Sequence, residues 1–185
     1  MYGRVCPWWL GYLLASPLRR WFDNPTRLLA PYVRDGMTVL EPGPGMGFFT
    51  LELARLVGPS GRVVAPEIQP RMIAGLKRRA ARAELADRVE ARNASRDSLG
   101  VDDLAGKVDF ALAYAVVHEI PDTARFFKET AAALKPGGRL LLAEPAGHVK
   151  PAEFDAELAL ARQSGLKVAE RPAIRRCHAA LLVKS

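Results

Sequence analysis

The sequence predicts an α/β fold: a doubly wound, mostly parallel seven-stranded sheet that ends in an antiparallel hairpin. Three observations lead to this prediction. Short apolar, β-branched segments alternate with helical patterns, a glycine-rich turn follows the first of these segments, and the last two strand patterns are joined too tightly for a helical crossover. The chain has 185 residues, 49% of them hydrophobic, which is enough for one ordinary core.

The first predicted helix begins with Asn24 as its cap and Pro25 in its first turn, and it is expected to end at Gly36. The segment MTVLE, residues 37–41, is short, apolar and β-branched, as is typical of a buried parallel strand. The glycine-rich turn comes next, and a second helix is expected over residues 48–58.

The same alternation continues through the middle of the chain. It predicts, in order, strand 62–67, helix 70–85, strand 88–94, strand 107–117, helix 122–138 and strand 139–144. Asp122 is expected to cap the helix that it begins, and Gly137 and Gly138 are expected to end that helix. Segment 107–117 is the most apolar strand, so we expect it to be central in the sheet.

The C-terminal part of the pattern predicts a helix over residues 151–164 and strands over 166–174 and 176–184, antiparallel to each other. No domain boundary is visible in the composition or the pattern. Residues 1–185 are therefore expected to form a single domain, with a core over 25–185.

Residues 1–24 are expected to act as an N-terminal cap or lid segment. This stretch is apolar and aromatic, but it is interrupted by Gly11 and Pro17 and falls short of the ~20 residues that a membrane span needs. Trp8, Trp9 and Tyr12 in it would wall an apolar acceptor or pack on helices, and weak contact with a membrane surface stays open.

The charge of the chain allows, but does not favour, a nucleic-acid partner. The net charge is +7 and the pI about 9.8. The densest basic run, residues 76–82, falls on a predicted helix without interleaved aromatic residues, which is typical of a solvated helix face. Cys6 and Cys177 lie far apart without metal-ligand spacing, so we expect no metal site and a cytoplasmic location.

The glycine-rich turn is the strongest functional signal. Gly43, Gly45 and Gly47 alternate after the first strand, where a parallel sheet exposes backbone N–H groups at the start of a helix. Glu67 ends the second strand about 20 residues later, where a carboxylate can accept hydrogen bonds from ribose hydroxyls. Ile68 would then flank an adenine ring. Together these residues predict a nucleoside-containing cofactor.

Glu41 separates two cofactors that share this pattern. A carboxylate inside the turn would repel the pyrophosphate of a nicotinamide dinucleotide. S-adenosylmethionine instead carries an ammonium group that the carboxylate can hold, while the N–H groups of the turn receive the carboxylate of the cofactor. The charge of Glu41 therefore favours S-adenosylmethionine.

At this point the chain is seen to resemble a known family. The segments VLEPGPGMGFFTLELARLVG, GRVVAPEIQPRM, NAS, KVDFALAYAVVHEIPD and LKPGGRLLLAEP are similar to those of the class I S-adenosylmethionine-dependent methyltransferases, close to the quinone-biosynthesis (type 11) small-molecule group. The resemblance covers residues 25–183. It implies the Rossmann-like methyltransferase fold and methyl transfer to a small-molecule acceptor.

The resemblance also implies a set of cofactor-binding residues: Glu41, Gly43, Pro44, Gly45, Gly47, Glu67, Ile68, Asn93, Ala94 and Tyr114. Asn93 stands where an aspartate commonly contacts the adenine amino group. An amide still supplies an acceptor oxygen.

Methyl transfer from a sulfonium is an in-line displacement, and only some acceptors need a base. The candidate catalytic residues are Tyr114, His118 and Glu119 at the end of the fourth strand, with Glu144 and His148 after the fifth. Each of them also has a structural interpretation, such as capping, surface pairing or core packing. The sequence therefore leaves a catalytic base open.

Three other functions stay open: a cofactor-binding module without turnover, an RNA methyltransferase and an NAD-dependent oxidoreductase. The absence of an NPPY-type tetrad weakens RNA base methylation, and Glu41 weakens the oxidoreductase. Cys6 alone is thin support for a metalloid acceptor. The pattern does not fix the acceptor atom or the oligomeric state.

Overall fold

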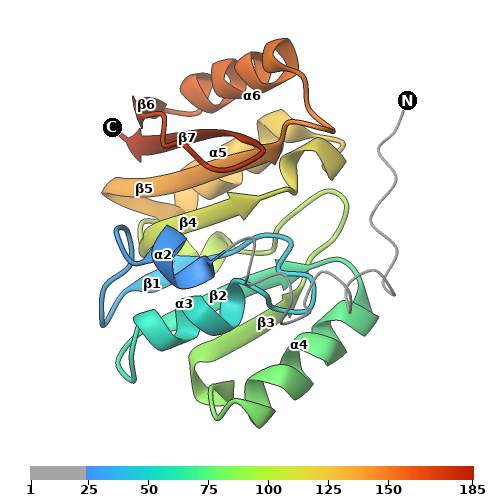
Figure 1. Ribbon diagram of the computed structural model, residues 1–185, viewed down its shortest axis with the longest axis vertical. Coiled ribbons are helices and arrows are strands. Elements are labelled where there is room, and N and C mark those ends of the chain that lie inside the picture. The colour runs from blue at the N-terminus through green and yellow to red at the C-terminus, as the bar shows by residue number, and fades with distance from the viewer. Residues whose placement is uncertain (1–23) are drawn as a thin grey trace. The chain divides into compact units, whose positions relative to one another are not determined.

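The computed structural model describes residues 24–185 of the chain (Figure 1). The predicted N-terminal cap or lid, with Cys6, Trp8, Trp9 and Tyr12, lies outside the described residues. The described strands follow the order β3-β2-β1-β4-β5-β7-β6 of a seven-stranded sheet. Their pairings are parallel except for those that involve β7, so the predicted fold class is confirmed.

Contacts along the chain group it into two compact units, which meet between Ser95 and Arg96. The first contains α2 (Pro25–Leu29), β1 (Thr38–Leu40), α3 (Thr50–Leu56), β2 (Arg62–Glu67), α4 (Pro70–Arg82), η2 (Ala86–Arg88) and β3 (Val89–Asn93). Its strands pair in parallel, β1 with β2 and β2 with β3, and α4 packs beside β3 (Figure 1). We call this the N-terminal unit.

The second, C-terminal unit contains η3 (Asp102–Leu104), β4 (Val108–Tyr114), η4 (Val117–Glu119), α5 (Thr123–Ala133), β5 (Leu134–Pro145), α6 (Pro151–Gln163), β6 (Leu166–Glu170) and β7 (Cys177–Lys184). β4 and β5 are parallel, whereas β7 is antiparallel to both β5 and β6 (Figure 1). The tight connection between the last two strands therefore produces the antiparallel hairpin that the sequence predicts.

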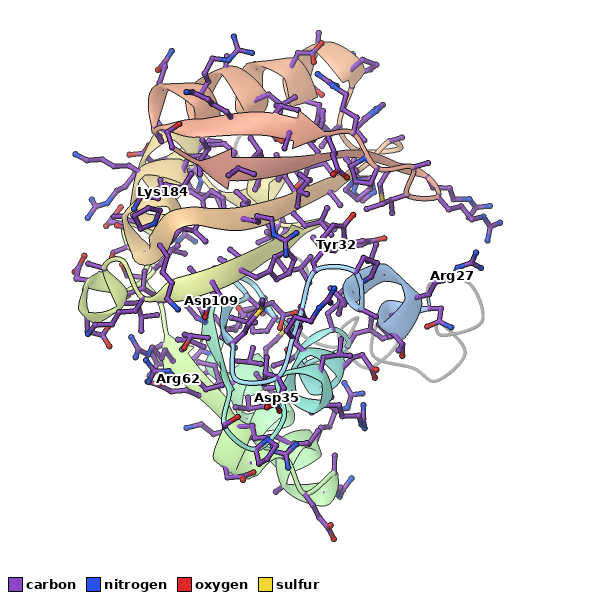
Figure 2. All side chains as sticks on the ribbon, turned by 90° about the vertical axis from the view of Figure 1, so that its left-hand side faces the viewer. Arg27, Tyr32, Asp35, Arg62, Asp109 and Lys184 are labelled. Atoms are coloured by element: carbon purple, nitrogen blue, oxygen red, sulfur yellow. The ribbon has the colours of Figure 1, made fainter. Side chains whose placement is uncertain are left out.

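Each unit has its own apolar core. In the N-terminal unit the fully buried side chains include Val39, Leu40, Leu53, Val63, Val64 and Leu76. In the C-terminal unit they include Phe110, Leu112, Phe127, Leu141, Leu142 and Leu182. Charged side chains such as those of Arg27 and Arg62 point outward (Figure 2). These cores fix the strand ends on which the candidate site residues lie.

The first predicted helix is shorter than expected. Asn24 caps it as predicted, accepting from the backbone N–H of Arg27 at 3.1 Å. The helix ends at Leu29, however, and Gly36 lies in a later turn with φ of +80°. Pro31 explains the difference, because it has no N–H with which to continue the helical hydrogen bonds.

The boundary between α5 and β5 also differs from the prediction. Asp122 caps α5 as expected, accepting from the N–H of Arg125 at 2.9 Å. The helix ends at Ala133 instead of residue 138, and β5 begins at Leu134, which has ψ of 142°. Pro136 is the physical reason: it lacks an N–H and disfavours a helical conformation at the residue before it.

Candidate functional site

The glycine turn of the N-terminal unit joins β1 to α3. Gly43, Gly45 and Gly47 have φ of +67°, +55° and +83°, a region that residues with a Cβ adopt only under strain. The N–H of Gly43 donates to the carbonyl of Pro66 at 2.9 Å, and that of Gly47 donates to the carbonyl of Pro44 at 2.9 Å. The turn is therefore tied to the end of β2 and to itself.

Gly47 has a second reason to lack a side chain. A Cβ at this position would lie 2.4 Å from Cδ1 of Leu76, whose side chain is fully buried and cannot move aside. At Gly45 the nearest atom to such a Cβ is Sδ of Met72 at 3.6 Å, an ordinary contact. The turn therefore packs its backbone directly against α4 at Gly47, whereas a Cβ at Gly45 would make an ordinary contact with Met72.

Glu67 meets the glycine turn at the carboxyl end of β2. Its side chain is buried, with 6% exposure, and Oε2 accepts from the N–H of Gly45 at 3.2 Å. Oε1 accepts from the N–H of Gln69 at 2.9 Å. The structure thus brings two predicted site residues, Glu67 and Gly45, into direct contact within one unit.

Glu41 is a buried carboxyl group with an unpaired oxygen. The residue is 4% exposed, and Oε2 has no hydrogen-bond partner among the described residues. Burial raises the pKa of Glu41 to about 8, and the nearby Thr50 hydroxyl offsets this in part. An unpaired buried carboxyl is costly, and a cationic ligand would relieve the cost by pairing with it.

Three further predicted residues lie at the same strand edge. Ile68 follows Glu67 directly and is 39% exposed, which is high for a large apolar side chain in this structure. Asn93 ends β3 as the register partner of Glu67, and its side chain is exposed. The N–H of Ala94 donates to the carbonyl of Glu67 at 3.0 Å. The carboxyl ends of β2 and β3 therefore present an apolar group and an amide side by side.

These features fit S-adenosylmethionine, residue by residue. The unpaired carboxyl oxygen of Glu41 suits an ammonium group, the bare backbone of the turn admits a ligand at van der Waals distance, and the carboxylate of Glu67 is an acceptor suited to ribose hydroxyls. Pyrophosphate fits poorly beside Glu41, because a buried carboxyl group opposes a second negative charge.

The candidate catalytic residues belong to the C-terminal unit. Tyr114 ends β4, and its hydroxyl lies 3.5 Å from Sγ of Cys177. Ala115 follows with φ of +55°, and its N–H donates to the carbonyl of Ala143 at 2.8 Å. This left-handed residue turns the chain from β4 into η4, which carries His118. The predicted strand 107–117 is therefore cut short after Tyr114.

Glu144 lies fully buried at the end of β5, beside His118. Its Oε2 is hydrogen-bonded to Nδ1 of His118, and its Oε1 accepts from the N–H groups of Val116 at 3.2 Å and Val117 at 2.8 Å. His148 meets the ring of His118 edge-on, with ring centroids 5.6 Å apart. The structure thus brings three of the candidates, His118, Glu144 and His148, into one cluster.

The cluster contains one residue that the sequence reasoning missed. Glu157 on α6 has its pKa raised to about 8, first by burial and then by the charge of Glu144. Glu157 lies next in sequence to Leu158 and three residues after Phe154, and both of these side chains are buried. The apolar residues beside Glu157 are the sequence signal that would have placed it at the edge of the buried face of α6.

The pKa of His118 is raised above its ordinary value. The hydrogen bond with Glu144 is the main cause; burial acts in the opposite direction, and the charges of Glu144, Glu119 and Glu157 raise it further. His118 keeps 22% of its side chain exposed, so a proton can reach it. The ring can exchange a proton near neutral pH.

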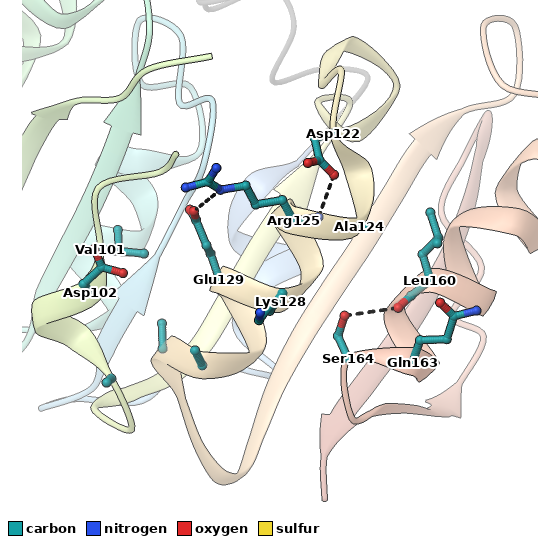
Figure 3. Close-up of a pocket in the computed structure, with 13 residues that line it drawn as sticks. Val101, Asp102, Asp122, Ala124, Arg125, Lys128, Glu129, Leu160, Gln163 and Ser164 are labelled. Atoms are coloured by element: carbon teal, nitrogen blue, oxygen red, sulfur yellow. Dashed lines mark hydrogen bonds and ion pairs between the residues drawn. The ribbon is translucent and has the colours of Figure 1, made fainter. Parts of the chain in front are cut away.

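A groove between α5 and α6 lies away from all of these residues (Figure 3). Arg125 pairs with Glu129 at 2.9 Å, one turn further along α5, and Ser164 donates from its hydroxyl to the carbonyl of Leu160 at 3.2 Å. None of the residues that line it was predicted as a site residue. The strand ends, where the predicted residues lie, therefore remain the candidate site.

Residues 24–185 contain neither a candidate metal site nor a candidate membrane-spanning helix. No three His, Cys, Asp or Glu side chains in this range are placed to hold a metal ion. No helix in the same range is long and apolar enough to cross a bilayer.

Comparison with known proteins identifies the family of the chain. A family described as a methyltransferase domain matches residues 33–172, which is more than half of the chain. The chain therefore belongs to this family of methyltransferase domains, and the resemblance read from the sequence motifs is confirmed. The cofactor of this class is S-adenosylmethionine.

Two of the similar proteins are named as methyltransferases. An arsenite methyltransferase from Halobacterium salinarum is 34% identical over 121 residues, covering 65% of this chain and 30% of the relative. A ubiquinone/menaquinone biosynthesis C-methyltransferase from Hahella chejuensis is 31% identical over 112 residues, covering 60% of this chain and 44% of the relative. The chain thus spans less than half of either relative.

A solved structure matches nearly the whole chain. The S-adenosylmethionine-dependent methyltransferase from Aquifex aeolicus superimposes with a TM-score of 0.86, covering 98% of this chain and 100% of that chain at 21% identity. At this identity the similarity establishes the fold.

Proposed function

We propose that the protein transfers a methyl group from S-adenosylmethionine to a small-molecule acceptor. The observation that carries the proposal is Glu41, a buried carboxyl group with an unpaired oxygen at the entrance to a turn of three positive-φ glycines. That combination calls for a positively charged ligand that can lie directly against the backbone of the turn.

Each part of the cofactor has a candidate partner in the N-terminal unit. Glu41 would hold the ammonium group, and the bare backbone at Gly43, Gly45 and Gly47 would lie against the methionine part. Glu67 would accept from the ribose, with Ile68 against the adenine face. Pro44, Asn93, Ala94 and, from the other unit, Tyr114 complete the proposed set. When bound, the cofactor supplies an electrophilic methyl group for in-line displacement.

A small molecule is the acceptor class that the named relatives support. Arsenite and quinone precursors are both small substrates, and these names belong to two of the relatives. We further propose that residues 1–185 act as a single domain in the cytoplasm, with 1–24 as the cap over the acceptor.

His118 is the residue we propose as the proton acceptor when the nucleophile of the acceptor carries a proton. It combines partial exposure with a carboxylate partner. Glu119 and Tyr114 have indirect roles in this proposal. Glu119 contributes negative charge near His118, and Tyr114 shapes the end of β4.

The test of cofactor binding is titration calorimetry with S-adenosylhomocysteine. The wild-type chain is expected to bind it, and the double variant Glu67→Ala/Gly45→Val is expected to lose binding, because it removes the ribose acceptor and strains the turn. A matched control, Glu90→Ala/Gly137→Val, changes an exposed acid and a positive-φ glycine with open space around it. Unchanged binding by the first variant would overturn the proposal.

The test of turnover is transfer of a labelled methyl group to a metabolite extract. Label in small molecules supports the proposal, while label in nuclease-sensitive material would make the protein an RNA methyltransferase instead. Binding of S-adenosylhomocysteine without any transfer would identify a non-catalytic module. Binding of NADH in its place would identify an oxidoreductase.

A further inference from the structure

We propose that Glu144 is a positioning residue that keeps the proton of neutral His118 on Nδ1 and thereby presents Nε2 to a hydroxyl or other protic acceptor. This inference rests on the proposed function, because it assigns a proton acceptor and a substrate class to that methyl transfer. Several hydrogen-bonding groups surround the buried carboxylate of Glu144.

Glu144 has no exposed surface, and both of its oxygens are engaged. Oε1 accepts from two backbone N–H groups, those of Val116 and Val117, and Oε2 faces Nδ1 of His118. An ionised carboxylate can only accept, so Nδ1 must carry the hydrogen. In the neutral imidazole the other nitrogen, Nε2, is then an acceptor.

The backbone is strained in a way that serves this arrangement. Ala115 has φ of +55°, a region that alanine adopts only under strain. The left-handed residue turns the chain directly after β4, so that the next two N–H groups point at Glu144 and His118 follows within the same short turn. Strain of this kind persists where the surroundings fix it, and it clusters at functional sites.

The charges around His118 tune when it can accept a proton. Glu144 on β5, Glu119 on η4 and Glu157 on α6 are acidic, and His148 in the loop after β5 touches the ring. The three acids raise the pKa of His118, so protonation of the ring is favoured below its raised pKa and the base form appears above it.

The reaction balances with the methyl donor of the proposed function, this chain and a protic acceptor. The nucleophile forms a bond to the methyl carbon while the carbon–sulfur bond breaks and its electron pair stays on sulfur. The proton of the nucleophile moves to Nε2 of His118 and later leaves to water. Glu144 stabilises the imidazolium formed in between, through the hydrogen bond that it already makes.

The decisive variant is Glu144→Gln, which preserves shape and changes one hydrogen-bonding direction. The amide oxygen can keep both backbone N–H groups, while the NH₂ group faces Nδ1 and requires it to accept. The proton of neutral His118 then moves to Nε2, which can no longer act as a base. Glu119→Gln is the matched control, because it removes a nearby charge and leaves the Glu144 bond intact.

Imidazole ¹⁵N spectra of the full chain, recorded between about pH 5 and pH 9, measure this directly. His118→Asn assigns the signal. In the wild type we expect a His118 pKa above the ordinary value and an Nδ1–H tautomer at high pH. In Glu144→Gln we expect a lower pKa and an Nε2–H tautomer, and in Glu119→Gln an unchanged tautomer.

Unchanged tautomer and pKa in Glu144→Gln would overturn the proposal. If that variant does not fold, an Nε2–H tautomer of neutral His118 in the wild type overturns it equally. S-adenosylhomocysteine titration separates this failure from that of the proposed function: a wild-type chain that does not bind it disproves the function whatever the tautomer, whereas normal binding with an unaltered tautomer disproves only the role of Glu144.

Discussion

The two units each bury a carboxyl group at a strand end, and the two groups differ in their partners. Glu41 in the N-terminal unit has an oxygen without a partner among the described residues, and burial raises its pKa to about 8. Glu144 in the C-terminal unit is equally buried but has three N–H partners, two from the backbone and one from His118. In our proposals, Glu41 binds the ammonium group of the cofactor, and Glu144 orients the ring of His118.

The hydrogen-bond partners of a buried carboxyl group indicate its role. Desolvation penalises any buried carboxylate, so the structure around it must either supply donors or leave room for one to arrive. The glycine turn supplies its N–H groups to Glu67 and to backbone carbonyls. The unpaired position is thereby left for a cation, and the predictions below test whether it is functional.

The largest effect is expected from closing the glycine turn. Gly47→Ala places a Cβ 2.4 Å from a buried Leu76 methyl group at a φ of +83°. We expect affinity for S-adenosylhomocysteine to fall at least about 100-fold, because the turn must shift away from its ligand-bearing position. Calorimetric titration gives the affinity, and thermal unfolding reports the loss of stability.

The control for this variant is Gly106→Ala in the other unit. Its φ of +64° imposes similar strain, but no atom lies within 4 Å of the new Cβ. It should lose about 1–2 kcal/mol of unfolding free energy and keep full affinity. If both variants bind equally well, the close packing of the turn has no role in binding.

The second prediction concerns the charge of Glu41. With a pKa of about 8, only about one molecule in a hundred carries the ionised form at pH 6. An ammonium ligand binds the ionised form, so the affinity for S-adenosylhomocysteine should rise roughly 50-fold from pH 6 to pH 8. In Glu41→Gln the affinity should be weak and independent of pH over this range. A parallel pH dependence in both proteins would contradict the assignment.

The same group makes a prediction for stability without ligand. The folded-state pKa of Glu41 is raised above its unfolded value of 4.5, so its contribution to stability is full below that value and is lost as pH rises through about 8. Relative to Glu41→Gln, the wild type should lose up to about 5 kcal/mol over this window. Urea unfolding at pH 5 and pH 8.5 measures the difference.

The sequence predicted the N-terminal unit better than the C-terminal one, and the reasons are physical. Glu41, the turn glycines and Glu67 follow from local spacing after apolar strands, which a single sequence displays. The bond between Glu144 and His118 joins residues 26 positions apart across two parallel strands, and spacing does not reveal it. The unpaired oxygen of Glu41 is also a property of packing and not of pattern.

The errors in the prediction have local causes. The helical period carried the expected helix through residue 138, but Pro136 ends the hydrogen-bond ladder and starts β5 at Leu134. Glu157 was not among the predicted site residues, although it borders the buried Phe154 and Leu158 on α6. Tertiary packing overrides pattern in both cases.

A smaller effect is expected from Glu67→Ala. Removing a charged acceptor should weaken binding of S-adenosylhomocysteine at least roughly tenfold, through loss of the ribose contact. Glu67 also holds the N–H of Gly45, so the matched variant Glu67→Gln, which keeps an acceptor oxygen, should lose less. Replacing the ligand by its 2′,3′-dideoxy analogue should weaken wild-type binding and leave Glu67→Ala unaffected. An equal loss in both proteins would assign Glu67 to the turn alone.

The smallest expected effect is an increase in affinity for S-adenosylhomocysteine. It tests Asn93, at the edge of the N-terminal unit, where the chain departs from its family. Asn93 is exposed at the end of β3, paired in register with Glu67, and offers one neutral acceptor to an adenine amino group. Asn93→Asp makes that hydrogen bond charge-assisted and should tighten S-adenosylhomocysteine binding about threefold. S-inosylhomocysteine has a carbonyl in place of the amino group, so the same variant should bind it more weakly. If Asn93→Asp changes both affinities in the same direction, net charge and not the adenine contact controls binding at this edge.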